Sequence, residues 1–238
     1  MTACSPETIQ LLARVPTAVV TGLLLKKHGL RMRAIPGIRP IDPARCRFDG
    51  PAFTLRYVPM REDIALAVDI GNPANAMLQA TQQIPAGSVF VMDMCGIGSV
   101  GGLGDVLTTR MQVRGVVGVV ADGGMRDVSE IRALGMPTFC KGPAAPASPS
   151  ALIPIAIQQP IGCGGVLVFP GDIMVGDEDG VAVIPAHLAD EIAQMGVEKE
   201  ALDGWVRERV AEGGDILGLY PPNESNLEKF RAWQATLN

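Results

Sequence analysis

The chain has 238 residues, 47% of them hydrophobic and 19% charged, which fits one domain, with or without extra end segments, and excludes a disordered protein. The net charge of −5 leaves no basic face for nucleic acid, so no nucleic-acid partner is expected. No apolar run approaches the roughly 18 residues of a membrane span, and the first residues lack the basic-then-apolar order of a signal peptide.

The first fifty residues predict two helices and an irregular segment. Ser-Pro-Glu at residues 5–7 supplies a capping hydroxyl, an N-terminal proline and an early acid, so a helix is expected from there to about Val15. A second helix is expected over Thr17–His28, ended by Gly29. Residues 31–51 are rich in proline and arginine, which is typical either of an arm extended over the surface to an oligomer contact or of an ordinary ordered loop.

From residue 51 onward, short apolar strands dominate the pattern. The expected strands are Ala52–Val58, Ile64–Val68, Ser88–Met92, Val116–Val120, Thr138–Cys140, Ile153–Gln158, Gly165–Val168, Ile173–Val175 and Val181–Ile184. Helices are expected over Pro73–Gln83 and Asp127–Leu134, and again from Ala186 to Ala211. The later strands follow one another without helices, which a purely doubly wound sheet would not show.

These elements suggest one structural domain with three parts. Residues 1–50 form N-terminal helices and the arm, residues 51–186 form the core that carries the site, and residues 187–238 form a C-terminal helical segment. The five cysteines lie far apart without a C-x-x-C pair, which indicates reduced thiols and a cytoplasmic location. With only two histidines, neither a histidine-rich metal site nor a Cys/His nucleophile is expected.

A glycine fingerprint follows the strand Ser88–Met92. Gly96, Gly98 and Gly101 form a G-x-G-x-x-G, and an acid, Asp122, ends the next strand, as in a dinucleotide-binding fold. In such a fold the helix begins within the fingerprint, so that its amides meet the pyrophosphate. Here the first good helix start is Asp105, and no Lys-Ser/Thr follows the glycines to make a phosphate loop. The pattern therefore disfavours a nucleotide.

Three charged residues follow neighbouring strands and offer a different chemistry. Asp105 and the adjacent pair Arg126 and Asp127 open successive helices, so they are expected at one edge of a sheet, beside free helix N-terminal amides. An arginine can clamp a small carboxylate while a carboxylate holds a hydrated Mg²⁺. The alternative from the residues alone is that the two acids are helix caps and the Arg-Asp pair is a surface ion pair.

The spacing of these residues resembles a known family. Gly101-x-x-Gly104-Asp105, twenty residues and then Arg126-Asp127 match the D-x20-R-D signature of class II pyruvate aldolases, the 4-hydroxy-4-methyl-2-oxoglutarate/4-carboxy-4-hydroxy-2-oxoadipate aldolases. These aldolases share a superfamily with proteins named for regulator of ribonuclease activity A. The blocks at residues 114–137 and 160–185 are similar to the family's two central blocks, and the resemblance covers roughly residues 50–200.

The resemblance implies a fold and a cofactor. The fold would be an α/β/β/α sandwich like that of swivelling phosphohistidine domains, assembled as a trimer or hexamer with sites between subunits. Asp127 would bind Mg²⁺ (or Mn²⁺) partly through waters, and Arg126 would bind the carboxylate of the 2-oxo acid and offset charge on the enolate. Asp105 would hold the water that carries a proton to the pyruvate methyl group.

The resemblance also implies substrate contacts. The helix start after Gly104 would offer the amides of Val106 and Leu107 to the substrate carboxylate. A further acid near the metal would come from a neighbouring subunit, with Glu198 or Glu200 in the C-terminal helix as candidates, although solvated positions on the face of that helix explain both residues better.

The expected function is that of a divalent-metal-dependent lyase. It would cleave by retro-aldol reaction, or decarboxylate, a pyruvyl-containing 2-oxo acid through an enolate stabilised by Mg²⁺. A Schiff-base mechanism is disfavoured, because only Lys141 of the five lysines is expected near the site. The N-terminal 50 residues and the tail from Gly218 resemble a longer subgroup with less secure substrates, which leaves two alternatives: a hydrolase or dehydratase of a sugar-derived 2-oxo acid, and a non-catalytic ribonuclease-binding regulator.

Overall fold

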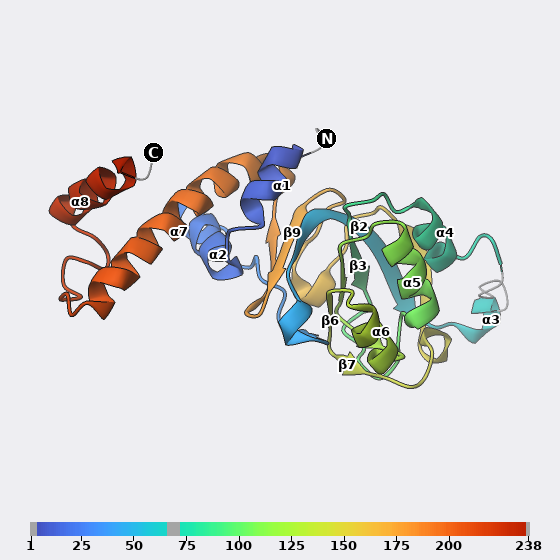
Figure 1. Ribbon diagram of the computed structural model, residues 1–238. Coiled ribbons are helices and arrows are strands. Elements are labelled where there is room, and N and C mark those ends of the chain that lie inside the picture. Colours follow the sequence, from blue (N-terminus) through green and yellow to red (C-terminus); the bar gives the residue numbers. More distant parts are fainter. Residues whose placement is uncertain (1–3, 66–71, 237–238) are drawn as a thin grey trace.

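The structure, a computed structural model, describes residues 4–65 and 72–236 (Figure 1). It is a mixed α/β fold whose layers run helix, sheet, sheet, helix, as expected. Three helices lie over the main sheet: α4 (Ala76–Gln83), α5 (Asp105–Val113) and α6 (Val128–Leu134). The outer layer at the opposite side is formed by α1 (Pro6–Leu12), α2 (Thr17–His28) and α7 (Ala189–Ala211).

One long strand, β2 (Phe48–Pro59), joins both sheet layers. Its residues 48–51 pair with β9, residues 52–56 pair in parallel with β3, and residues 55–59 pair with β8. The strand order is β1-β6-β4-β3-β2-β9-β10, and β2, β3, β4 and β6 run parallel. The other strands are β1 (Arg39–Pro40), β3 (Val89–Asp93), β4 (Gly118–Ala121), β6 (Thr138–Cys140), β8 (Leu152–Ile157), β9 (Ile173–Asp177) and β10 (Gly180–Ile184), with a small separate pair formed by β5 (Gly124–Met125) and β7 (Gly142–Pro143).

Side-chain alternation along β3 separates two apolar cores. Phe90 and Met92 point to the core beneath α4, α5 and α6, while Val89 and Val91 point to the core shared with β9 and β10. Both faces of β3 are therefore buried, which explains why its sequence is continuously apolar. A third core packs the outer faces of β9 and β10 against α1, α2 and α7.

The N-terminal helices follow the sequence prediction closely. Ser5 caps α1 through its hydroxyl, and α2 covers Thr17–His28 and ends at Gly29, which adopts a φ of +67°. The start of α2 has no cap of its own. Instead the buried carboxylate of Asp177, at the end of β9, accepts bonds from the Thr17 amide at 2.8 Å and the Thr17 hydroxyl at 2.6 Å. This contact joins the outer helical layer to the sheet.

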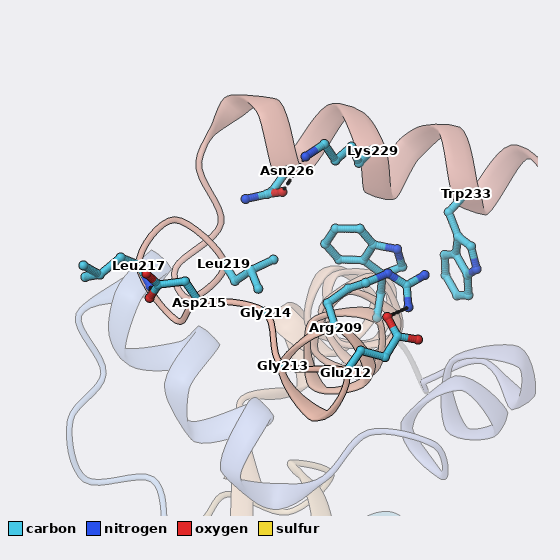
Figure 2. A pocket seen from close by; sticks show the side chains of 11 residues that line it. Arg209, Glu212, Gly213, Gly214, Asp215, Leu217, Leu219, Asn226, Lys229 and Trp233 are labelled. Carbon is cyan, nitrogen blue, oxygen red and sulfur yellow. Dashed lines mark hydrogen bonds and ion pairs between the residues drawn. The ribbon is translucent and has the colours of Figure 1, made fainter.

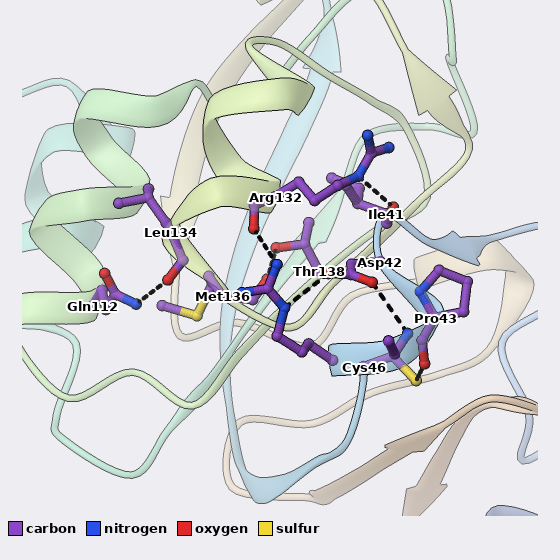
Figure 3. A network of polar contacts seen from close by, with 11 residues as sticks. Ile41, Asp42, Pro43, Cys46, Gln112, Arg132, Leu134, Met136 and Thr138 are labelled. Carbon is purple, nitrogen blue, oxygen red and sulfur yellow. Dashed lines mark hydrogen bonds and ion pairs between the residues drawn. The ribbon is translucent and has the colours of Figure 1, made fainter.

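Residues 31–51 are not an arm extended over the surface. Ile35, Ile38 and Cys46 are buried in the core between the sheet layers, and the short strand β1 adds to the sheet edge. Figure 3 shows the polar contacts that fasten this segment: Arg45 donates to the carbonyl of Arg132 in α6 at 3.0 Å, and Arg132 donates to the carbonyl of Ile41 at 3.3 Å. The proline and arginine content correctly predicted an irregular backbone for residues 31–51, but it did not predict that Ile35, Ile38 and Cys46 would be buried.

The same network holds α5 and α6 together. The side-chain amide of Gln112, in the last turn of α5, donates to the carbonyl of Leu134 at the end of α6 at 2.8 Å (Figure 3). The two helices that follow β3 and β4 therefore keep a fixed spacing at their C-terminal ends.

Two predicted strands are corrected by the structure. Residues 62–65, which include the start of the predicted strand Ile64–Val68, form the short helix α3 (Glu62–Ala65), and residues 66–68 lie outside the described residues. Gly165–Val168 is not a strand, because Gly164 and Gly165 have φ values of +57° and +78° that turn the chain, leaving one bridge between Ile161 and Val168.

The C-terminal helices extend from the body of the molecule. The end of α7 packs on α8 (Glu224–Ala235) through Trp205 and Phe230. An open groove of about 750 Å³ lies between the two helices, and Figure 2 shows the residues that line it. In the part of the chain that the structure covers, no single helix is long and apolar enough to cross a membrane. The bent pair of α1 and α2 meets that criterion jointly, with a bend of 108°.

We predict that Asp177→Ala lowers the free energy of unfolding by about 2–3 kcal/mol, because it leaves the buried Thr17 donors without an acceptor. Thermal or urea unfolding followed by circular dichroism measures the loss. Asp179→Ala is the control, since Asp179 contacts Asp177 only through its backbone amide. Equal stability of the two variants would contradict this account of how the outer layer is attached.

Candidate functional site

Residues 101–103 are clamped between two other segments at the edge of the main sheet. The Gly101 amide donates to Pro146 at 2.8 Å, and the Gly101 carbonyl accepts from Ser148 at 3.0 Å. On the other side, the Gly102 amide donates to the Gly124 carbonyl at 3.0 Å and the Arg126 amide donates to the Leu103 carbonyl at 3.0 Å. The turns after β3 and β4 are thereby brought into direct contact.

Two glycines make this approach possible. A Cβ on Gly101 would overlap the Cγ of Arg126, and a Cβ on Gly104 would lie 2.5 Å from Oδ2 of Asp127. Neither glycine has a positive φ. Gly101 is required by space, because its Cβ would also lie 2.9 Å from the backbone nitrogen of Arg126, whereas at Gly104 the carboxylate of Asp127 would have to move. The two glycines thus accommodate the protein's own charged side chains.

Arg126 and Asp127 are exposed and carry free charges. Among the residues that the structure describes, neither side chain has a hydrogen-bond or ion-pair partner, and Asp127 does not cap α6 through its carboxylate. Asp127 also has a φ of +51°, a conformation that costs a non-glycine residue about 1 kcal/mol or more. An ion pair between the two, the simpler alternative from the sequence, is not formed.

Asp105 begins α5, as predicted. Its Oδ1 accepts from the amide of the next residue, Val106, at 2.8 Å, and Gly104 is the N-cap. The Val106 amide therefore already has an acceptor within the protein, and its contact with a substrate carboxylate stays a prediction. The Leu107 amide makes no hydrogen bond within the described chain, so it stays available to an anion at the positive end of this nine-residue helix.

A pocket of about 320 Å³ collects these groups. Its lining consists of residues 101–107, the pair Arg126 and Asp127, and residues 147–149. The sequence analysis predicted that Asp105, Arg126 and Asp127 meet at one edge of a sheet, and they do. The sequence analysis did not place residues 147–149 at the site. Their signal in the sequence is the stretch at residues 142–150, rich in proline, alanine and serine, which ends in a turn packed on Gly101.

Other candidates from the sequence lie outside this pocket. The Lys141 ammonium donates to the Gly96 carbonyl at 2.8 Å. Asp122 is buried and accepts from the amides of Met94 at 2.5 Å and Gly96 at 3.1 Å, so it is not available to a ribose; burial raises the pKa of its carboxyl. The fingerprint loop is thus held by the protein itself.

Glu198 and Glu200 lie on α7, in the outer layer, and do not line the pocket of their own chain. Glu200 pairs with Arg207 at 3.3 Å. Whether either reaches the site of a neighbouring subunit stays a prediction.

The larger groove between α7 and α8 is a weaker candidate for the functional site than the pocket that contains Arg126. Arg209 stacks over Trp205 with 5.3 Å to the ring centroid and pairs with Glu208 and Glu212, each at 3.5 Å. Lys229 lies 3.5 Å from the side-chain oxygen of Asn226 (Figure 2). The cationic side chains of this groove, Arg209 and Lys229, thus already have partners, whereas Arg126 has none in the described chain.

The pocket can be tested for the divalent metal that the family resemblance implies. In the described parts of the chain no group of three His, Cys, Asp or Glu side chains could hold a metal ion. A single unpartnered carboxylate, Asp127, faces the pocket. Mg²⁺ suits this arrangement, because it keeps several waters and commonly takes one or two carboxylates together with substrate oxygens. Zinc, which needs three or four protein ligands, does not.

The sequence and the structure both match known proteins. A family model described as RraA-like, Aldolase/RraA, matches residues 13–183. A curated protein of Halalkalibacterium halodurans, provisionally named 4-hydroxy-4-methyl-2-oxoglutarate aldolase, is 39% identical over 134 residues, or 56% of this chain. The match spans 63% of that relative's length, less than two thirds.

Two solved structures resemble nearly the whole fold. RraAS2 of Streptomyces coelicolor, described as an unusual member of the RNase ES inhibitor RraA protein family, is 32% identical with a TM-score of 0.78, over 86% of this chain and 98% of that one. An uncharacterized protein of Pseudomonas syringae pv. tomato is 25% identical with a TM-score of 0.79, over 92% of this chain and 100% of that one.

We predict that Asp127→Gly is more stable than Asp127→Ala by about 1 kcal/mol, because only glycine adopts a positive φ without strain. Both variants lack the carboxylate, so the comparison isolates the backbone. Urea unfolding measures the difference. If the alanine variant is as stable as the glycine variant, the strain at this position is not present in solution.

Proposed function

Because the chain belongs to the RraA-like family of Aldolase/RraA proteins, we propose that it is a divalent-metal-dependent lyase that cleaves or decarboxylates a pyruvyl-containing 2-oxo acid. The observation that carries the proposal is the pair Arg126 and Asp127. Both side chains line the pocket without partners in the described chain, and Asp127 has a strained backbone with a φ of +51°. Unpaired charge and strain of this kind are expected where a ligand completes the site.

Each charged group of the pocket has a part in the proposed reaction. Arg126 binds the substrate carboxylate through paired hydrogen bonds, assisted by the Leu107 amide at the start of α5. Asp127 would hold Mg²⁺, which when bound supplies Lewis-acid stabilisation of negative charge on the keto oxygen. Asp105, held by the Val106 amide, positions a water close to the reacting carbon.

The retro-aldol reaction balances with these groups. The bond between C3 and C4 breaks, and its electron pair remains with the 2-oxo acid fragment. The C4 hydroxyl gives its proton to the water next to Asp105 and becomes a carbonyl. C3 gains a proton through the water next to Asp105 and becomes the methyl group of pyruvate. In decarboxylation of oxaloacetate, carbon dioxide leaves in place of the carbonyl fragment and the same proton is delivered.

We predict that Arg126→Ala lowers kcat/KM for oxaloacetate decarboxylation by about 10²–10³-fold, because the carboxylate loses its clamp. Arg126→Lys is expected to recover only part of the loss, since an ammonium cannot bind bidentately. Pyruvate release is measured with a coupled assay. Arg110→Ala is the control: it removes a cation of α5 that contacts Gln82 outside the pocket. Equal rates for the two alanine variants would contradict the proposal.

We predict that EDTA abolishes this activity and that Mg²⁺ or Mn²⁺ restores it. Isothermal titration of the metal-free protein with Mg²⁺ in the presence of pyruvate provides a readout besides activity, and Asp127→Asn should weaken that binding. Activity that survives complete metal removal would rule out the metal-dependent mechanism.

The likeness to RraAS2 supports a second candidate, a ribonuclease-binding regulator. This role would use a surface and would give the unpaired Arg126 and Asp127 no task. Inhibition of RNase ES by the wild-type protein, together with no turnover of any 2-oxo acid at saturating Mg²⁺, would establish the regulator. A hydrolase or dehydratase acting on a sugar-derived 2-oxo acid would use the same pocket and would be distinguished by its products.

A further inference from the structure

A second cavity adjoins the charged pocket. It has a volume of about 130 Å³ and is more enclosed than the first. Gly102, Leu107, Ser148 and Pro149 line both cavities. A ligand anchored by Arg126 and extending past Leu107 would reach this second cavity.

The walls of the second cavity are apolar. The residues that line it away from the shared edge include Met60, Met77, Ile153 and Pro154, three of them buried. No lysine, arginine, histidine, aspartate or glutamate is among its lining residues in the described chain. This composition contrasts with the charged pocket next to it, where three ionisable side chains meet.

Two polar side chains in the second cavity, Tyr57 and Asn75, already make hydrogen bonds to the protein backbone. The Tyr57 hydroxyl donates to the Gly102 carbonyl at 3.2 Å, and burial raises its pKa, so it stays a neutral donor. The Asn75 side chain caps α4, accepting from the amides of Met77 at 2.9 Å and Leu78 at 3.4 Å. None of the described residues that line this cavity carries a charge that could pair with a charged ligand group, so the desolvation of such a group would be poorly compensated.

We propose that this cavity receives an uncharged, apolar substituent on C4 of the substrate, with room for about four non-hydrogen atoms at about 30 Å³ each. The inference rests on the proposed function and adds a substrate class: 4-hydroxy-2-oxo acids with a short alkyl group at C4. A second carboxylate at this position is disfavoured. Met60, Met77 and Ile153 are then the residues that determine specificity.

The test runs the reaction in the direction of synthesis, adding pyruvate to aldehydes in the presence of Mg²⁺. A bond forms between the pyruvate methyl carbon and the aldehyde carbon, and the proton lost by the methyl group ends on the new hydroxyl. Isobutyraldehyde carries an isopropyl group and glyoxylate a carboxylate. Both groups have two non-hydrogen atoms branching from one carbon, and the main difference between them is charge. We expect kcat/KM to rise about fourfold per added carbon from acetaldehyde to isobutyraldehyde, and glyoxylate to fall below acetaldehyde.

A second measurement separates this inference from the proposed function. Exchange of the pyruvate methyl protons in D₂O, followed by NMR, requires the charged pocket alone. Absent exchange would overturn the proposed function and this inference with it. Exchange that is present, together with a preference for glyoxylate over isobutyraldehyde, would overturn only the apolar cavity.

Substitution of Met60 supplies a matched pair of variants. Met60 is partly exposed, so Met60→Lys can place a cation at the cavity rim while its methylene groups keep the packing of the methionine. Met60→Gln is the neutral control of similar length. We expect the ratio of kcat/KM for glyoxylate to that for isobutyraldehyde to rise at least tenfold in Met60→Lys and not in Met60→Gln. Equal ratios in the two variants would show that substrate does not reach this cavity.

Discussion

The close approach of residues 101–104 to Arg126 and Asp127 is the constraint on which the site depends. The backbone groups of these residues are paired with each other and with neighbouring segments. The Ser148 amide donates to the Gly101 carbonyl on one side, and the Arg126 amide donates to the Leu103 carbonyl on the other. Because the backbone is satisfied in this way, the two charged side chains are left free. Glycine at 101 and 104 gives them the space that any larger residue would fill.

The rest of the fold keeps this arrangement rigid. Parallel pairing of β3 with β4 sets the two strand ends side by side, and the buried Asp122 ties the loop after β3 to the turn at Gly164 through amide hydrogen bonds. The contact between Gln112 and Leu134 fixes the far ends of α5 and α6. The site is thus built on elements whose other ends cannot move independently, which is what preorganised charge requires.

Local sequence signals predicted the parts of the fold that depend on neighbouring residues. Ser5 and Gly29 marked helix ends because capping is decided within a few residues. The same signals failed at residues 31–51, where proline and arginine described the backbone but not the burial of Ile35 and Ile38. They failed also at Gly165–Val168, where the apolar residues pack in the core from a turn rather than a strand. Side chains that are buried outside helices and strands leave no regular hydrophobic period in the sequence, so the pattern of apolar residues does not predict their burial.

The sequence by itself determined the class of the fold, the family and the three charged residues, because their spacing places Asp105, Arg126 and Asp127 after adjacent parallel strands. Only the tertiary structure decided what surrounds them. It showed that the Val106 amide belongs to Asp105, that the charges of Arg126 and Asp127 are unpaired, and that an apolar cavity adjoins them. Those properties arise where segments near residues 60, 77, 105, 127 and 150 meet, and contacts between distant segments leave no local pattern in the chain.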